Sequence, residues 1–122
     1  MTQTTSKKIK LMPDYGCHPL WWAVGSGKAG DIDPTTLPLK LETVARLEKW
    51  AAVFDELLNE DDSAASGFAS DRERSAFDGE GIELWLELRK ELSPEYEVLY
   101  FCQQLREHLA EPKDLDKLLV AR

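Results

Sequence analysis

The stretch from Leu41 to Leu58 constrains the fold more than any other part of this sequence. Its apolar residues recur at spacings of three and four, which places them along one side of a helix. They are Leu47, Trp50, Ala51, Phe54, Leu57 and Leu58. Burial of each large apolar side chain contributes about 1.5–3 kcal/mol. This helix therefore needs an apolar surface to pack against.

A second helix is expected to begin at Ser70 and to end before Pro94. The run from Ser70 to Glu73 fits a capping box, in which the serine and glutamate side chains bind first-turn amides. The apolar stripe that follows is Phe77, Gly81, Leu84, Trp85, Leu88 and Leu92. Gly79 and Gly81 each cost about 1 kcal/mol relative to alanine inside a helix. We therefore expect Gly81 to allow the close approach of another backbone.

The segment Tyr96–Phe101 is β-branched and aromatic, and it is the strongest strand signal in the chain. It is apolar on both faces, which is typical of an inner strand. The alternating run Ile9–Met12 predicts a strand that closes before Pro13. Leu20–Val24 is a candidate second strand, and the residues from Asp31 to Leu39 are expected to lie extended across the surface.

After the Tyr96–Phe101 strand, Leu105 and Leu109 predict a short helix. Pro112 then separates a last helical segment that carries Leu115, Leu118 and Leu119. These patterns predict an α+β fold, with a small sheet of two to three strands packed on a helical hairpin, plus a short C-terminal helix. The length predicts a single domain over 1–122. Its parts are a loose N-terminus (1–7), strand and extended segments (8–40), the hairpin (41–92), and a strand with short helices (95–122).

The net charge of −8 is unevenly distributed. Residues 41–92 contain 14 acidic and 6 basic residues, whereas the rest of the chain contains 9 of each. Such a field repels nucleic acid and anionic lipid and attracts cationic partners. We therefore expect no nucleic acid or membrane partner. The alternative is that the acidic residues only keep a small protein soluble.

The two cysteines, Cys17 and Cys102, lie far apart and have no CxxC spacing. No apolar signal segment precedes them, so a reduced, cytoplasmic setting is expected. The longest apolar run is much shorter than the ~20 residues that span a bilayer.

Three patterns suggest chemistry but fit it poorly. The run Gly25–Lys28 resembles part of a phosphate-binding loop, yet Trp22 and Ala29 occupy places that require glycine and Ser or Thr. Cys17 and His18 suggest an activated thiolate, but no third orienting group is evident. The acidic pairs at 31/33 and 61/62 offer oxygen ligands without the spacing of a calcium loop. We therefore expect no cofactor and no metal.

Trp21 and Trp22 are adjacent, and adjacent strand residues point to opposite faces. One ring is therefore a candidate exposed anchor for a protein partner, because aromatic residues are favoured at interface centres. In the alternative, the 25–38 segment covers the second ring.

A further set of residues carries a resemblance to a known group. The set comprises Leu11–Trp21, Gly30–Pro34, Leu37–Leu39, Trp50, Phe54, Asp55, Leu58, Asn59, Asp61, Asp62 and Ser66–Phe68. This pattern resembles small acidic bacterial proteins, some of which look like immunity proteins of polymorphic-toxin and contact-dependent growth inhibition systems. It covers most of residues 9–101. The glycines at 79 and 81, and Lys40 in place of a capping serine, depart from it locally.

The resemblance implies a non-enzymatic inhibitor that binds a cognate toxin domain, and the charge favours a basic, nuclease-type toxin. The candidate contacts are acidic or aromatic: Asp14, Tyr15, Trp21, Trp22, Asp31, Asp33, Glu60, Asp61 and Asp62. One alternative is a small enzyme or ligand-binding protein with a pocket around Asp14, Tyr15, Cys17 and His18. Another is a homodimer that uses the exposed tryptophan.

Overall fold

The computed structural model describes residues 7–23, 27–58 and 67–120. The strands are β1 (Lys7–Leu11), β2 (Leu20–Trp22), β3 (Asp31–Ile32), β4 (Tyr96–Cys102) and β5 (Glu107–Leu109). The long helices are α1 (Leu41–Asp55) and α2 (Asp71–Leu92). Shorter helical segments are η1 (Pro34–Thr36), η3 (Pro112–Asp116) and α3 (Lys117–Val120).

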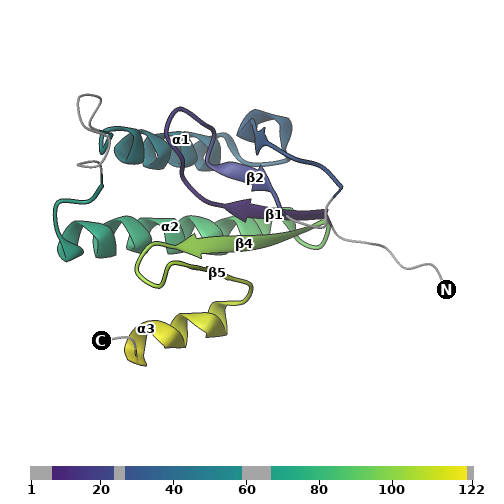
Figure 1. Cartoon of the computed structure of the whole chain (residues 1–122). Coiled ribbons are helices and arrows are strands. Elements are labelled where there is room, and N and C mark those ends of the chain that lie inside the picture. Colours follow the sequence, from purple (N-terminus) through teal and green to yellow (C-terminus); the bar gives the residue numbers. More distant parts are fainter. Residues whose placement is uncertain (1–6, 24–26, 59–66, 121–122) are drawn as a thin grey trace.

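The sheet has five strands in the order β3-β2-β1-β4-β5. The central strand β1 runs antiparallel to β2 and parallel to β4, with Ile9 opposite both Trp22 and Val98. Helices α1 and α2 lie together on one face of this sheet (Figure 1). The α+β class is as expected, and β4 is an inner strand.

Two expectations from the sequence were wrong. The sheet has five strands and not two to three, because the extended segment at Asp31 adds β3 as one edge. The other edge is β5, which replaces the short helix expected at Leu105 and Leu109. Both edge strands are very short, so neither has enough residues to show a clear alternation in the sequence.

The core lies between the sheet and the two long helices. From the sheet, Ile9, Leu11, Val98, Tyr100 and Cys102 are buried. All six residues of the predicted α2 stripe are also buried: Phe77, Gly81, Leu84, Trp85, Leu88 and Leu92. The helix expected over Leu41–Leu58 ends at Asp55. Its stripe is less completely covered, since Leu47 and Trp50 are buried but Phe54, and Leu57 in the turn beyond the helix, are half-buried.

The two long helices begin in different ways. At α2, the Ser70 hydroxyl accepts a hydrogen bond from the Glu73 amide, as the capping box predicts, while the Glu73 carboxylate accepts from the Ala69 amide. At α1, Lys40 provides no side-chain cap. The carboxylate of Glu91 from α2 takes this role, accepting from the Lys40 amide at 2.8 Å and from the Thr43 hydroxyl at 2.5 Å.

Gly81 does allow a close approach, but side chains make it and not another backbone. A Cβ atom at this position would lie 2.5 Å from the Tyr100 hydroxyl oxygen and 2.7 Å from Cζ2 of Trp50. Both rings are buried. The absence of a side chain at Gly81 therefore lets Trp50 of α1 and Tyr100 of β4 pack directly against α2.

The buried carboxylate of Asp78 fixes the turn between β4 and β5. It accepts hydrogen bonds from the Tyr100 hydroxyl at 2.5 Å and from the Gln103 and Gln104 amides, each at 2.9 Å. Burial, followed by the charge of Asp78, raises the pKa of the Tyr100 hydroxyl. Burial likewise raises the pKa of the Cys102 thiol to about 11. The Tyr100 hydroxyl and the Cys102 thiol therefore favour their protonated forms, and both stabilise the core.

Candidate functional site

The loop between β1 and β2 is attached to the C-terminal end of α1. The amide of Gly16, a residue with a positive φ of 72°, donates a hydrogen bond to the Asp55 carboxylate at 3.0 Å. The ring of Tyr15 stacks on Phe54, with 4.7 Å between the ring centroids. One polar and one aromatic contact therefore hold the loop against the last turn of α1.

The same loop is also attached to the edge strand β3. The Asp31 carboxylate accepts a hydrogen bond from the His18 amide at 2.8 Å, and the Asp14 carboxylate accepts one from the Tyr15 amide. We call Asp14, Asp31 and Asp55 the acidic loop cluster. All three residues are exposed.

The acidic loop cluster affects the pKa of the nearby Cys17 thiol. Partial burial raises the pKa of Cys17, and the charges of Asp14, Asp31 and Asp55 raise it further. The negative charges of all three carboxylates therefore act on the Cys17 thiol. A nucleophilic cysteine requires the opposite shift, toward the thiolate, and the sulfur instead lies 3.5 Å from the carbonyl oxygen of Tyr15.

The carboxylates of the acidic loop cluster take part in no ion pair with any Lys or Arg that the structure describes. Several acidic residues elsewhere do have such partners. On α2, Glu80 and Glu83 pair with Arg46, and Glu87 pairs with Lys40 and Lys90. The negative charge of the cluster is therefore not neutralised within the described chain.

The structure brings together three of the nine predicted contact residues, namely Asp14, Tyr15 and Asp31. Asp33 instead caps η1, accepting from the Thr35 amide and hydroxyl, and these hydrogen bonds lower the pKa of its carboxyl. Glu60, Asp61 and Asp62 lie outside the described residues. Asp55 was not among the nine predicted contacts, although it belongs to the resemblance pattern.

Both Trp21 and Trp22 are half-buried. Trp22 packs against the core, and the ammonium of Lys28 lies 4.6 Å from its ring centroid. Trp21 pairs across the sheet with Lys10 and Asp31, and its indole nitrogen donates to the Met12 carbonyl at 2.9 Å. The segment after β2 therefore does contribute cover to one ring, as in the alternative expectation.

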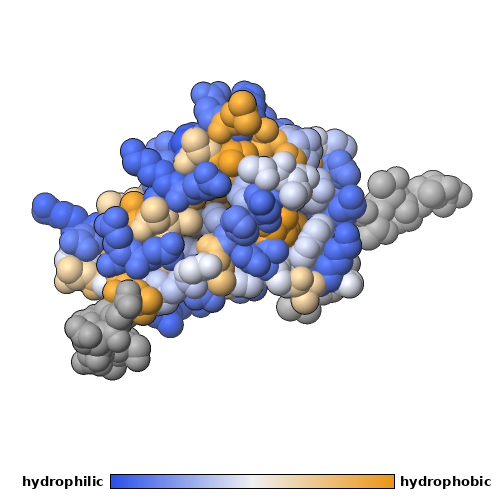
Figure 2. All heavy atoms as spheres, turned by 90° about the horizontal axis from the view of Figure 1, so that it is seen from above, coloured by the Kyte–Doolittle hydropathy of each residue, from blue (hydrophilic) through white to orange (hydrophobic). Residues whose placement is uncertain are grey.

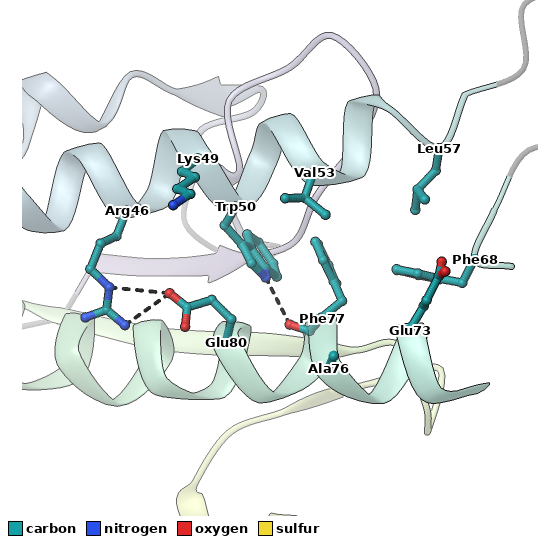
Figure 3. A pocket seen from close by; sticks show the side chains of 10 residues that line it. All are labelled: Arg46, Lys49, Trp50, Val53, Leu57, Phe68, Glu73, Ala76, Phe77 and Glu80. Atoms are coloured by element: carbon teal, nitrogen blue, oxygen red, sulfur yellow. Dashed lines mark hydrogen bonds and ion pairs between the residues drawn. The ribbon is translucent and has the colours of Figure 1, made fainter. Parts of the chain in front are cut away.

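A second feature is a cavity of about 610 Å³ between α1 and α2 (Figure 3). Its lining residues are Arg46, Lys49, Trp50, Val53, Leu57, Phe68, Glu73, Ala76, Phe77 and Glu80. At its inner wall the rings of Trp50 and Phe77 stack at 4.4 Å, and the Trp50 indole donates to the Phe77 carbonyl. None of Asp14, Tyr15, Cys17 and His18 lines it. We call it the helix groove.

The surface near α1 is mostly hydrophilic. Figure 2 looks at the molecule from above the α1 side of Figure 1, and it shows charged and polar side chains between a few separate hydrophobic patches. Among the described residues, no group of three or more His, Cys, Asp or Glu side chains is arranged to hold a metal ion. In the same part of the chain, no helix is long and apolar enough to cross a membrane.

Comparison with protein families matches residues 7–103 to the family described as Serratia CdiI immunity protein-like. The chain belongs to this family. The matched region extends from β1 to just beyond β4, so it contains the acidic loop cluster and the helix groove. No curated protein matches the sequence. Membership of the CdiI immunity protein-like family supports an immunity function in general.

Proposed function

We propose that this chain is a non-enzymatic immunity protein that binds and neutralises a cognate toxin domain of the basic, nuclease type. Family membership supports the immunity role. The acidic loop cluster is the observation that carries the choice of a basic partner. Its three carboxylates are exposed, close to one loop, and without a cation partner in the described chain.

Nucleases hold the phosphates of their substrates with Lys and Arg side chains. An acidic protein that binds this cationic surface excludes the nucleic acid, either by covering the active site or by docking beside it. Backbone hydrogen bonds already orient the carboxylates of Asp14, Asp31 and Asp55. Binding therefore requires little further ordering of these side chains, which lowers its entropic cost. Contacts by Trp21, Trp22, Asp33, Glu60, Asp61 and Asp62 remain predictions.

The test is co-expression with the product of the adjacent upstream gene, as the candidate toxin. The proposal expects a stoichiometric complex and rescue of growth. A triple variant, Asp14→Asn/Asp31→Asn/Asp55→Asn, removes the charge but keeps a hydrogen-bond acceptor at each position. Three exposed ion pairs of about 0.5 kcal/mol each amount to about 1.5 kcal/mol, so binding should weaken about tenfold.

A matched control removes the same charge elsewhere, through Glu95→Gln/Glu97→Gln/Glu107→Gln. These glutamates pair with lysines of the chain itself, so this variant should bind within about threefold of the wild type. Absence of a complex with the wild-type chain would refute the proposed function. Equal weakening by both triple variants would show that total charge matters and the cluster does not.

The alternative function is a small enzyme or ligand-binding protein that uses Asp14, Tyr15, Cys17 and His18. The double variant Cys17→Ala/His18→Ala separates the two functions. An immunity protein that acts by binding should still protect the cell at wild-type level. Loss of protection by a variant that folds and still forms the complex would favour the enzyme.

A further inference from the structure

The helix groove exposes apolar surface that the described chain does not cover. The side chain of Val53 at its mouth is 48% exposed, and Leu57 is half-buried. Figure 3 shows Val53 from α1, and Leu57 from the turn just after α1, projecting toward Phe77 and Phe68 on the opposite side. Apolar surface that stays in contact with water costs free energy which a partner can recover by covering it.

The shape of the groove favours a convex protein segment as its occupant. Lys49, Val53, Glu73, Ala76 and Glu80 are exposed lining residues, so a small molecule would stay largely in contact with water. Small-molecule sites instead bury most of their ligand. A symmetric pair of chains that met through this face would place one concave surface against another. An apolar side chain that projects from a partner protein would fill the groove, and the surrounding surface of that partner would shield the groove from water.

The charges around the groove are balanced. Its lining contains two cations, Arg46 and Lys49, and two anions, Glu73 and Glu80. Arg46 already pairs with Glu80 at 3.1 Å. The groove therefore offers apolar contact area and shape, whereas the acidic loop cluster offers charge. This difference predicts that the two surfaces affect different steps of binding.

Both surfaces lie next to the last turns of α1, so one partner can reach both. Val53 lines the groove, and Asp55 belongs to the cluster. Residues two positions apart in a helix lie on nearly opposite sides of it, and a helix with its side chains is about 10–12 Å wide. A standard interface covers about 800 Å² on each partner, which is enough to extend across such a rod. The half-buried ring of Phe54 lies between the two surfaces. Its centroid is 4.7 Å from that of Tyr15, in the loop of the acidic cluster, and 5.8 Å from that of Phe77, in the groove.

We propose that the helix groove receives an apolar anchor side chain from the toxin domain, and that this contact sets how slowly the complex dissociates. The proposal rests on the proposed function and deepens it. The acidic loop cluster accelerates association in a salt-dependent way, as complementary charges do. The anchor acts after encounter, because apolar burial in a fitted pocket acts mainly on the dissociation rate.

The test measures association and dissociation rates by surface plasmon resonance, using the upstream-encoded toxin domain inactivated at its catalytic residue. Ala76→Trp places an indole ring at the mouth of the groove from an exposed position. Loss of a central anchor should raise the dissociation rate about 30-fold or more. The association rate and its dependence on salt should stay within about twofold of the wild type.

The matched control is Ala45→Trp, which adds the same ring at an exposed position of α1 outside the groove. It should leave both rates unchanged. If circular dichroism shows that Ala76→Trp does not fold, Val53→Asp replaces it. In the free protein the side chain at position 53 is partly exposed, so a carboxylate there stays hydrated. In the complex, the anchor would bury that carboxylate without a partner, which costs free energy of binding.

The outcomes separate the two proposals. The groove proposal is overturned if the wild-type chain forms a complex but the groove variant, Ala76→Trp or Val53→Asp, dissociates no faster than Ala45→Trp. That result leaves the proposed function intact. A change confined to the association rate would also overturn it. No complex with the wild-type chain would refute the proposed function itself.

Discussion

The two glycines of α2 provide a controlled test of how closely the core is packed. Gly79→Ala and Gly81→Ala introduce the same methyl group into the same helix. In both, alanine gains about 1 kcal/mol of helix propensity. At Gly79 the new Cβ atom meets nothing within 4 Å, so this variant should be more stable than the wild type by about 1 kcal/mol, or about 4 °C in melting temperature.

At Gly81 the same gain is opposed by steric overlap. The new Cβ atom would lie 2.5 Å from the Tyr100 hydroxyl oxygen and 2.7 Å from a ring carbon of Trp50. Tyr100 is held by Asp78, and both rings are buried, so neither can move away cheaply. Overpacking of this kind costs about 1–3 kcal/mol. Gly81→Ala should therefore be about 1–3 kcal/mol less stable than Gly79→Ala.

The measurement is urea-induced unfolding of both variants, followed by far-ultraviolet circular dichroism and by tryptophan fluorescence. Two-state behaviour with equal m values allows the free energies to be compared directly. If Gly81→Ala proves as stable as Gly79→Ala, the helix and the two rings have room that the structure does not show, and the packing argument is wrong.

Two further predictions concern the buried and capping carboxylates. Asp78→Ala leaves the Tyr100 hydroxyl and two backbone amides without their acceptor, so it should lower the free energy of unfolding by about 3 kcal/mol or more; a loss below about 1 kcal/mol in urea unfolding would contradict this. For Glu91, burial acts to raise the pKa, but hydrogen bonds from the Thr43 hydroxyl and the Lys40 amide outweigh it, and the carboxyl pKa is lowered. A lowered pKa stabilises the fold above the unfolded-state value, and this stabilisation is lost as pH falls through the folded-state value. Glu91→Gln should therefore cost about 1 kcal/mol at neutral pH, and its difference from the wild type should shrink below about pH 4; a difference that does not change with pH would contradict the assignment.

The helices were predictable because their signals are local. Phe77, Leu84 and Leu88 repeat at helical spacing, and Ser70 and Glu73 mark the start of α2. The cap of α1 was not predictable, since Glu91 lies far from Lys40 in sequence. Which distant side chain satisfies a helix end is decided by tertiary packing, which no spacing rule contains.

The error at β5 has a physical origin. Leu105 and Leu109 are four residues apart, which fits one helical turn. In the structure, the carboxylate of Asp78 binds the amides of Gln103 and Gln104, and Arg106 has a positive φ of 58°, so the chain turns back as a strand. A buried carboxylate on another helix overrides the local pattern there.

The candidate site was predictable in part. Asp14, Tyr15 and Asp31 were singled out as acidic and aromatic residues near turns, and the structure places them around one loop. Asp55 was not predicted as a contact, because the helical period shows which side of α1 it occupies but not which loop faces that side. The groove was also not predicted, since it depends on how α1 and α2 separate near Phe68.

The central pairing of the sheet also determines when the protein can fold during synthesis. Strand β1 is made first, yet its parallel partner β4 pairs Lys7 with Tyr96 and Leu11 with Tyr100. A ribosome must therefore release the chain as far as β4 before the middle of the sheet can close, and such distant pairing is slow to form. A chain truncated before Tyr96 lacks β4 and cannot close the middle of the sheet, so any function that needs the folded protein should be lost.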